Sequence, residues 1–148
     1  MSHSIAWEVD EPCVDDVEVR RTLDAALSHG GRAGIQLSVV FVTDPVLARL
    51  HEEALGDPSE TDVISFDLGE EGGGPAGELY VSVDCARTQA AQRRVTLGRE
   101  LALYLVHGAL HLCGFDDHEP EDRERMRAAE RTVLEGLGHA PDPTPHDV

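Results

Sequence analysis

The chain has 148 residues, enough for one domain with a real hydrophobic core and too few for two comfortable ones. Its composition, 41% hydrophobic and 28% charged residues, is typical of a soluble globular protein and argues against a disordered or membrane-spanning chain. The net charge of −17, with arginine as every one of the 12 basic side chains, disfavours nonspecific binding to nucleic acid, although arginines or a bound cation can reverse the potential inside one cleft.

Strands and helices alternate through the first part of the chain. Polar and apolar residues alternate over residues 4–9, which predicts a short strand. Apolar residues recur at helical spacing over residues 14–28 and stop at a glycine pair, which predicts a helix. Residues 35–43 are β-branched and apolar and predict a buried strand, and an Asp-Pro pair then begins a short helix over residues 44–53.

Two further strands are expected in the middle of the chain. Turn residues predict a loop over residues 56–60, and the sequence T-D-V-I-S-F at residues 61–66 predicts a strand. The alternating sequence G-E-L-Y-V-S-V-D at residues 77–84 predicts a strand that pairs with it across a glycine-rich hairpin connection.

The last part of the chain is helical. Helices are predicted over residues 85–94, over the strongly apolar residues 97–112 and over the amphipathic residues 121–137. The proline-rich residues 139–148 predict a disordered tail. The order of elements therefore predicts a single α+β domain over residues 1–138, with a small mixed sheet covered by helices.

The expected compartment is the cytoplasm. The N-terminal residues lack a basic region followed by an apolar block, as a secretory signal would have, and no apolar run approaches the roughly 20 residues of a membrane-spanning helix. The odd number and wide spacing of Cys13, Cys85 and Cys113 predict reduced, packed thiols rather than disulfides.

A candidate metal site lies at the end of the apolar helix. His107 and His111 are four residues apart, so their imidazoles project from the same helical face and can bind one cation. Gly114 ends the helix and lets the chain turn back, which allows Asp117 or His118 to reach the same ion. Three protein ligands and one open position are typical of catalytic zinc, and the residues alone do not choose between the two candidates for the third ligand.

The alternative interpretation of the histidine pair is packing. Such a pair on an apolar helix is usually structural, and the glycine, two aspartates and third histidine that follow at once are what favour a metal site. The zinc-protease signature H-E-x-x-H would need glutamate where this chain has Gly108, so peptide hydrolysis is disfavoured.

The segment H-G-A-L-H-L-C-G-F-D-D-H resembles the motif H-G-x-L-H-L-x-G-Y-D-H of the YbeY family of bacterial metal-dependent endoribonucleases. The strands T-D-V-I-S-F and G-E-L-Y-V-S-V-D resemble T-D-V-L-S-F and G-E-I-x-I-S-x-D of the same family, and with Glu100 they extend the similarity from about Leu37 to Met126. Most of the expected domain is covered.

The resemblance implies a hydrolase, a single-strand-specific endoribonuclease that holds one Zn²⁺ per chain, acts in small-subunit ribosomal-RNA 3′-end maturation and ribosome quality control, and meets ribosomal particles. His107 and His111 would be the catalytic metal ligands, with His118 or Asp117 as the third. The ion would polarise a phosphoryl oxygen or supply a hydroxide. The competing hypothesis is a non-catalytic accessory protein of ribosome assembly that uses zinc only for structure.

The sequence departs from the family motif at two places. The third family histidine falls on Asp117, so either this carboxylate replaces it or a loop longer by one residue brings in His118, which is slightly preferred as the imidazole. Many members have an arginine in the loop before T-D-V-L-S-F, where this chain has Leu55. Candidate replacements for contacting phosphate are Arg87 and Arg94 first, then Arg93 and Arg99.

Other polar residues receive structural interpretations. Asp62 and Asp84 are expected to cap turns and bond to backbone rather than to catalyse. Cys113 is expected to point away from the histidine face and to pack. The charged residues 119–131 are expected to form a solvated helix face stabilised by pairs of opposite charge.

Overall fold

A mixed β-sheet forms the centre of the protein. The computed structural model describes residues 3–55 and 62–140, and its sheet has the strand order β1-β2-β4-β3 within those residues. The strands are β1 (Ser4–Trp7), β2 (Leu37–Val42), β3 (Val63–Asp67) and β4 (Gly77–Ser82). β1, β2 and β4 run parallel, whereas β3 pairs antiparallel with β4. The mixed sheet predicted from the sequence is confirmed.

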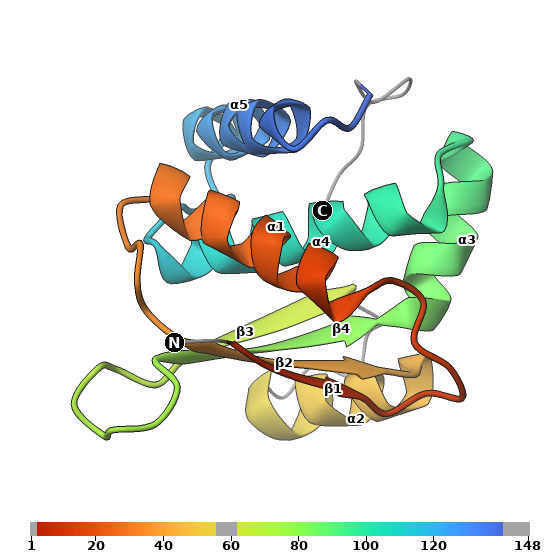
Figure 1. Cartoon of the computed structure of the whole chain (residues 1–148), viewed down its shortest axis with the longest axis horizontal. Helices are drawn as coiled ribbons and strands as arrows, with labels where there is room; N and C mark the ends of the chain where they lie inside the picture. Colours follow the sequence, from red (N-terminus) through yellow and green to blue (C-terminus); the bar gives the residue numbers. More distant parts are fainter. Residues whose placement is uncertain (1–2, 56–61, 141–148) are drawn as a thin grey trace.

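Helices cover both faces of this sheet (Figure 1). They are α1 (Asp16–His29), α2 (Asp44–Leu55), α3 (Val83–Arg93), α4 (Leu97–Leu112) and α5 (Pro120–Gly136). α1 and α4 lie on one face and α2 on the other, while α5 forms an outer layer on α1 and α4 (Figure 1). α4 therefore packs against the sheet and against α1, α3 and α5.

The enclosure of α4 follows from its sequence. The Thr96 side chain accepts a hydrogen bond from the backbone N–H of Arg99 and begins the helix. Almost every residue from Arg99 to Leu112 is buried. Because the helix carries apolar side chains on nearly every side, their burial stabilises one fixed position of the helix over the sheet. The predicted bounds of this helix, 97–112, are confirmed.

One difference from the predicted elements lies after β4. The sequence predicts a strand over residues 77–84, but the strand ends at Ser82. The Ser82 hydroxyl accepts a hydrogen bond from the N–H of Cys85 and caps α3, so Val83 and Asp84 form the first helical turn. Apolar and polar residues continue to alternate past Ser82, so this pattern predicts a strand end two residues too late.

Some predictions concern residues that the structure does not describe. The loop predicted over residues 56–60 lies outside the described residues, as do residues 141–148 of the tail that was expected to be disordered. The domain limits at 1–138 stay a prediction for the same reason. Within residues 3–55 and 62–140, none of the helices combines the length and apolarity needed to span a membrane.

Gly108 allows α4 to lie directly on the sheet. A Cβ atom at this position would stand 2.9 Å from Leu79 Cδ2 and 3.2 Å from Ser65 Oγ. The Ser65 hydroxyl also donates a hydrogen bond of 3.1 Å to the Gly108 carbonyl oxygen. The residue after His107 therefore faces β3 and β4, where the glutamate of H-E-x-x-H would not fit.

We expect Gly108→Ala to lower the free energy of unfolding by about 1–3 kcal/mol, because the added methyl group overpacks a buried contact. Urea denaturation of the variant and the wild type measures this difference. Gly98→Ala on the same helix is the matched control, since its Cβ would meet only Val14 Cγ1, at 3.6 Å. Equal stabilities for the two variants would show that α4 does not pack this closely.

Candidate metal centre

The end of α4 brings the third candidate ligand back toward the two histidines. Gly114 has φ of +98°, the left-handed conformation that glycine adopts most easily. Its N–H donates to the His111 carbonyl oxygen and the N–H of Phe115 donates to the Leu110 carbonyl oxygen, both at 3.0 Å. These paired bonds terminate the helix and reverse the chain. The following residues therefore lie beside the histidine face.

Three side-chain atoms converge at this place. His107 Nε2 and His111 Nε2 are 3.0 Å apart, and Asp117 Oδ2 lies 3.5 Å from each of them. Zinc bonds of about 2.0–2.2 Å to nitrogen and oxygen in a tetrahedron imply ligand separations of about 3.3–3.6 Å. The observed separations are close to that range, and the donors are of the types that a divalent transition metal binds. These residues therefore fit a metal ion.

The structure places the two candidates for the third ligand differently. The Asp117 side chain is 18% exposed and faces both imidazoles. The His118 side chain is 83% exposed, and its Nε2 lies 3.5 Å from Asp116 Oδ1. Asp117 thus forms a possible metal-binding group with His107 and His111. His118 belongs to a second such group, with Asp116 and Asp117. Asp117, six residues after His111, is therefore the candidate that faces the two imidazoles.

Hydrogen bonds on both sides hold the loop that carries Asp117. The Asp116 carboxylate accepts from the N–H groups of Asp117, at 2.7 Å, and His118, at 3.3 Å. Arg123 of α5 donates through Nε to the Asp117 carbonyl oxygen and through Nη2 to that of His118, each at 3.2 Å. The position of Asp117 is therefore fixed from its own loop and from α5.

The surroundings of the partly exposed His111 imidazole favour its neutral form. Burial lowers the pKa of His111, and the neighbouring His107 lowers it further, while the Asp117 carboxylate partly opposes both effects. A neutral imidazole has the lone pair that a metal ligand needs. His111 thus remains available as a ligand to lower pH than an ordinary histidine.

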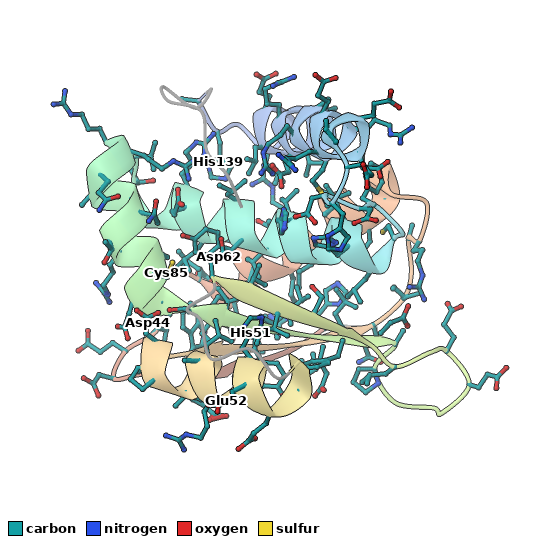
Figure 2. The ribbon with its side chains drawn as sticks, turned by 180° about the vertical axis from the view of Figure 1, so that it is seen from behind. Asp44, His51, Glu52, Asp62, Cys85 and His139 are labelled. Atoms are coloured by element: carbon teal, nitrogen blue, oxygen red, sulfur yellow. The ribbon has the colours of Figure 1, made fainter. Side chains whose placement is uncertain are left out.

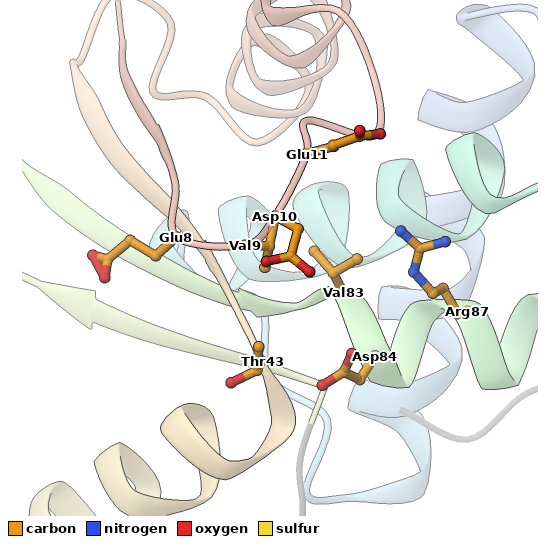
Figure 3. Close-up of a pocket in the computed structure, with 8 residues that line it drawn as sticks. All are labelled: Glu8, Val9, Asp10, Glu11, Thr43, Val83, Asp84 and Arg87. Atoms are coloured by element: carbon orange, nitrogen blue, oxygen red, sulfur yellow. The ribbon is translucent and has the colours of Figure 1, made fainter.

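The arginines expected to contact phosphate do not lie in this group. Arg87 lines a hollow of about 710 Å³ together with Glu8, Asp10 and Asp84, after the carboxyl ends of β1, β2 and β4 (Figure 3). Arg94 is exposed and caps the end of α3. Arg94 lies just before the first residue of α4, Leu97. That residue is ten positions before His107, which corresponds to about 15 Å along the helix.

The two other candidate arginines are buried and hold structural bonds. Arg93 Nη1 lies 2.8 Å from Glu100 Oε2, and Arg99 Nε donates to the Ala140 carbonyl oxygen at 3.2 Å. Among the described residues, Arg123 of α5 donates to the Asp117 carbonyl oxygen. Arg127 of α5 pairs with Glu130, whose carboxylate lies against His107. The sequence predicts that both arginines of α5 lie on a solvated helix face. This prediction is wrong for Arg127, because its side chain is largely buried.

A buried glutamate was also missed. Glu130 is 1% exposed, and its Oε2 lies 2.6 Å from His107 Nδ1. The prediction that residues 119–131 form a solvated face is wrong here, because α5 buries one side against α4. The signal was present in the sequence, since Glu130 falls in step with Met126, Val133 and Leu134 on the apolar stripe of the helix.

The structural interpretations of three other residues can be compared with their contacts. Asp84 Oδ2 accepts a hydrogen bond of 2.9 Å from the backbone N–H of Asp44, which confirms its bonding to backbone. Cys113 packs against Gly30, where a Cβ would stand 2.4 Å from its Sγ. Asp62 lies before β3 on the side of α4 (Figure 2), where burial raises its pKa and the charge of His107 opposes that rise.

Comparisons with known proteins agree on one family. The family model described as endoribonuclease YbeY matches residues 8–138. Curated relatives named endoribonuclease YbeY include one from an Anaeromyxobacter strain, 41% identical over 80% of this chain and 64% of its own length. Another, from Mycolicibacterium smegmatis, is 40% identical over 91% of this chain and 80% of its own. A third, from Chlorobium luteolum, is 34% identical over 84% and 90%.

The fold is also shared with a solved structure. A solution structure of a Thermotoga maritima protein superposes with a TM-score of 0.60 and covers 97% of this chain and 99% of that chain. Its sequence is 21% identical, so this likeness concerns the fold alone.

Proposed function

The chain belongs to the endoribonuclease YbeY family, and we propose that it is a metal-dependent endoribonuclease whose ion is held by His107, His111 and Asp117. The observation that carries this proposal is the convergence of two imidazole nitrogens and one carboxylate oxygen within 3.5 Å of one another. An ion bound there would polarise a phosphoryl oxygen and favour deprotonation of water. The chain supplies the rigid helix and the fixed loop that hold these donors.

Zinc, at one ion per chain, is the proposed metal. Two neutral imidazoles favour a transition metal over magnesium or calcium, and a single carboxylate is compatible with zinc. The donor group of His107, His111 and Asp117 contains three ligands among the described residues. Three ligands would leave a position for substrate or water, which favours the enzyme over an accessory protein with a closed, purely structural zinc site.

The proposed substrate is single-stranded ribosomal RNA in the cytoplasm. The protein would cleave it during 3′-end maturation of the small-subunit RNA and in ribosome quality control. The names of the relatives support RNA as substrate. The net charge of −17 opposes RNA binding over most of the surface. The ion, with Arg123 bonded to the loop that carries Asp117, would make the potential at the centre more positive.

Zinc-loaded protein should cleave unstructured RNA and leave casein intact. Gly108 faces the sheet and provides no carboxylate to activate water for peptide hydrolysis. Incubation with unstructured RNA, structured RNA and casein at low salt measures the preference, and RNA binding should weaken steeply as salt is added. Cleavage of casein without cleavage of RNA would overturn the ribonuclease assignment.

A further inference from the structure

A chain of buried polar contacts connects α5 to the metal centre. Glu130 lies on the face of α5 that packs against α4, with Met126 and Val133 buried on the same stripe. An ionised side chain on such a stripe is costly unless it has partners. Its partners are the His107 imidazole on one side and the Arg127 guanidinium on the other.

The contact with His107 determines which ring nitrogen faces the other ligands. A carboxylate only accepts hydrogen bonds, so the 2.6 Å separation between Glu130 Oε2 and His107 Nδ1 places the ring proton on Nδ1. The lone pair then lies on Nε2, the atom that faces His111 and Asp117. A different tautomer would place a proton between the donors and oppose metal binding.

Arg127 holds the glutamate in the orientation that this contact requires. Its Nη1 lies 3.2 Å from Glu130 Oε1 and 3.4 Å from Oε2. The positive guanidinium offsets part of the cost of burying the carboxylate. These two neighbours of Glu130, a ring N–H and a guanidinium, are therefore matched to a carboxylate.

We infer that Glu130, held by Arg127, is a positioning residue that orients His107 and fixes its tautomer for metal binding. The inference rests on the proposed function, because it assigns a role toward the ion held by His107, His111 and Asp117. The carboxylate also polarises the imidazole and makes Nε2 a better donor, and loss of such a partner typically weakens metal binding by about 10–100-fold.

Metal affinity of purified, metal-stripped protein tests this role. The dissociation constants of Zn²⁺ and Co²⁺ are measured by competition with a chelator for the wild type, Glu130→Ala and Glu130→Gln. We expect about 10–100-fold weaker binding for Glu130→Ala and a smaller loss for Glu130→Gln, whose amide oxygen still accepts from Nδ1–H. The NMR signal of the His107 Nδ1 proton should persist in Glu130→Gln and be lost in Glu130→Ala.

Glu100→Gln is the matched control. Glu100 is as buried as Glu130 and is also paired with an arginine, but it lies seven residues before His107 on α4. It should lose folding stability and keep wild-type metal affinity. If Glu130→Ala does not fold, Glu130→Gln decides the matter alone.

The outcomes separate this inference from the proposed function. Wild-type affinity in the Glu130 variants, or an equal loss in Glu100→Gln, would overturn the positioning role while the metal site itself stands. A wild-type protein that binds neither ion would overturn the proposed function and, with it, the role of Glu130.

Discussion

Bound zinc should fall from about one equivalent per chain to almost none when His107 and His111 are both replaced by alanine. The two imidazoles supply the nitrogen donors of the group, and they lie on a helix whose residues from Arg99 to Leu112 are almost all buried. The remaining Asp117 carboxylate would hold zinc too weakly to survive desalting. Elemental analysis of the desalted proteins measures the ratio of metal to chain.

A variant that removes two other histidines provides the comparison. His29 and His51 lie on α1 and α2, outside the metal group, so their double alanine variant should keep about one equivalent of zinc. His111→Ala alone leaves the His107 contact with Glu130 intact and should already lose most of the ion. Equal metal content in the wild type and the His107, His111 variant would place the site elsewhere.

Asp117→Ala should weaken metal binding by more than about 100-fold, whereas His118→Ala should change it by less than about threefold. Loss of a direct ligand is expected to exceed the roughly 10–100-fold effect of losing a residue behind a ligand. Asp117 faces both imidazoles, and His118 is largely exposed beside Asp116. Chelator competition measures both affinities under the same conditions.

Asp117→His is the informative third variant. It restores the imidazole that the family motif carries at this position, and it should retain tight zinc binding because zinc accepts either donor. The opposite order, with His118→Ala far more damaging than Asp117→Ala, would mean that the loop changes conformation around the ion. His118 would then be the third ligand, as the sequence alone slightly favoured.

The fold was largely predictable because local patterns determine most of its elements. The apolar residues of α4 repeat without interruption between a Thr96 cap and Gly114, and its predicted bounds match those observed. The end of β4 was not predictable from alternation, since the Ser82 hydroxyl begins α3 two residues earlier than the pattern suggests. A single side-chain hydrogen bond decided that boundary.

The candidate site was only partly predictable because its parts come from different elements. The spacing of His107 and His111 is a local property of one helix and is visible in the sequence. The choice between Asp117 and His118 depends on how the chain turns after Gly114 and on the hydrogen bonds from Arg123. The spacing of residues along the chain does not contain that information.

The role of α5 depends on the packing of two helices. Charged residues from 119 to 131 fit a solvated face by composition, yet Glu130 reaches His107 because its side of α5 packs on α4. The arginines at the α3 segment were chosen as candidates for contacting phosphate from the sequence alone. In the structure they do not contact the metal group. Arg87 lines the hollow with Glu8 and Asp84, and its role toward phosphate stays a prediction, as does that of Arg94. Arg123 contacts the loop at Asp117.

Titration of zinc into metal-free protein, with cleavage of an unstructured RNA as the signal, tests the central claim most directly. The wild type should be inactive without metal, gain activity in proportion to added zinc and reach a plateau at about one equivalent per chain. The His107→Ala, His111→Ala variant should stay inactive throughout. Cleavage by the metal-free wild type, or equal cleavage by the double variant, would contradict the assignment of a metal-dependent endoribonuclease centred on these residues.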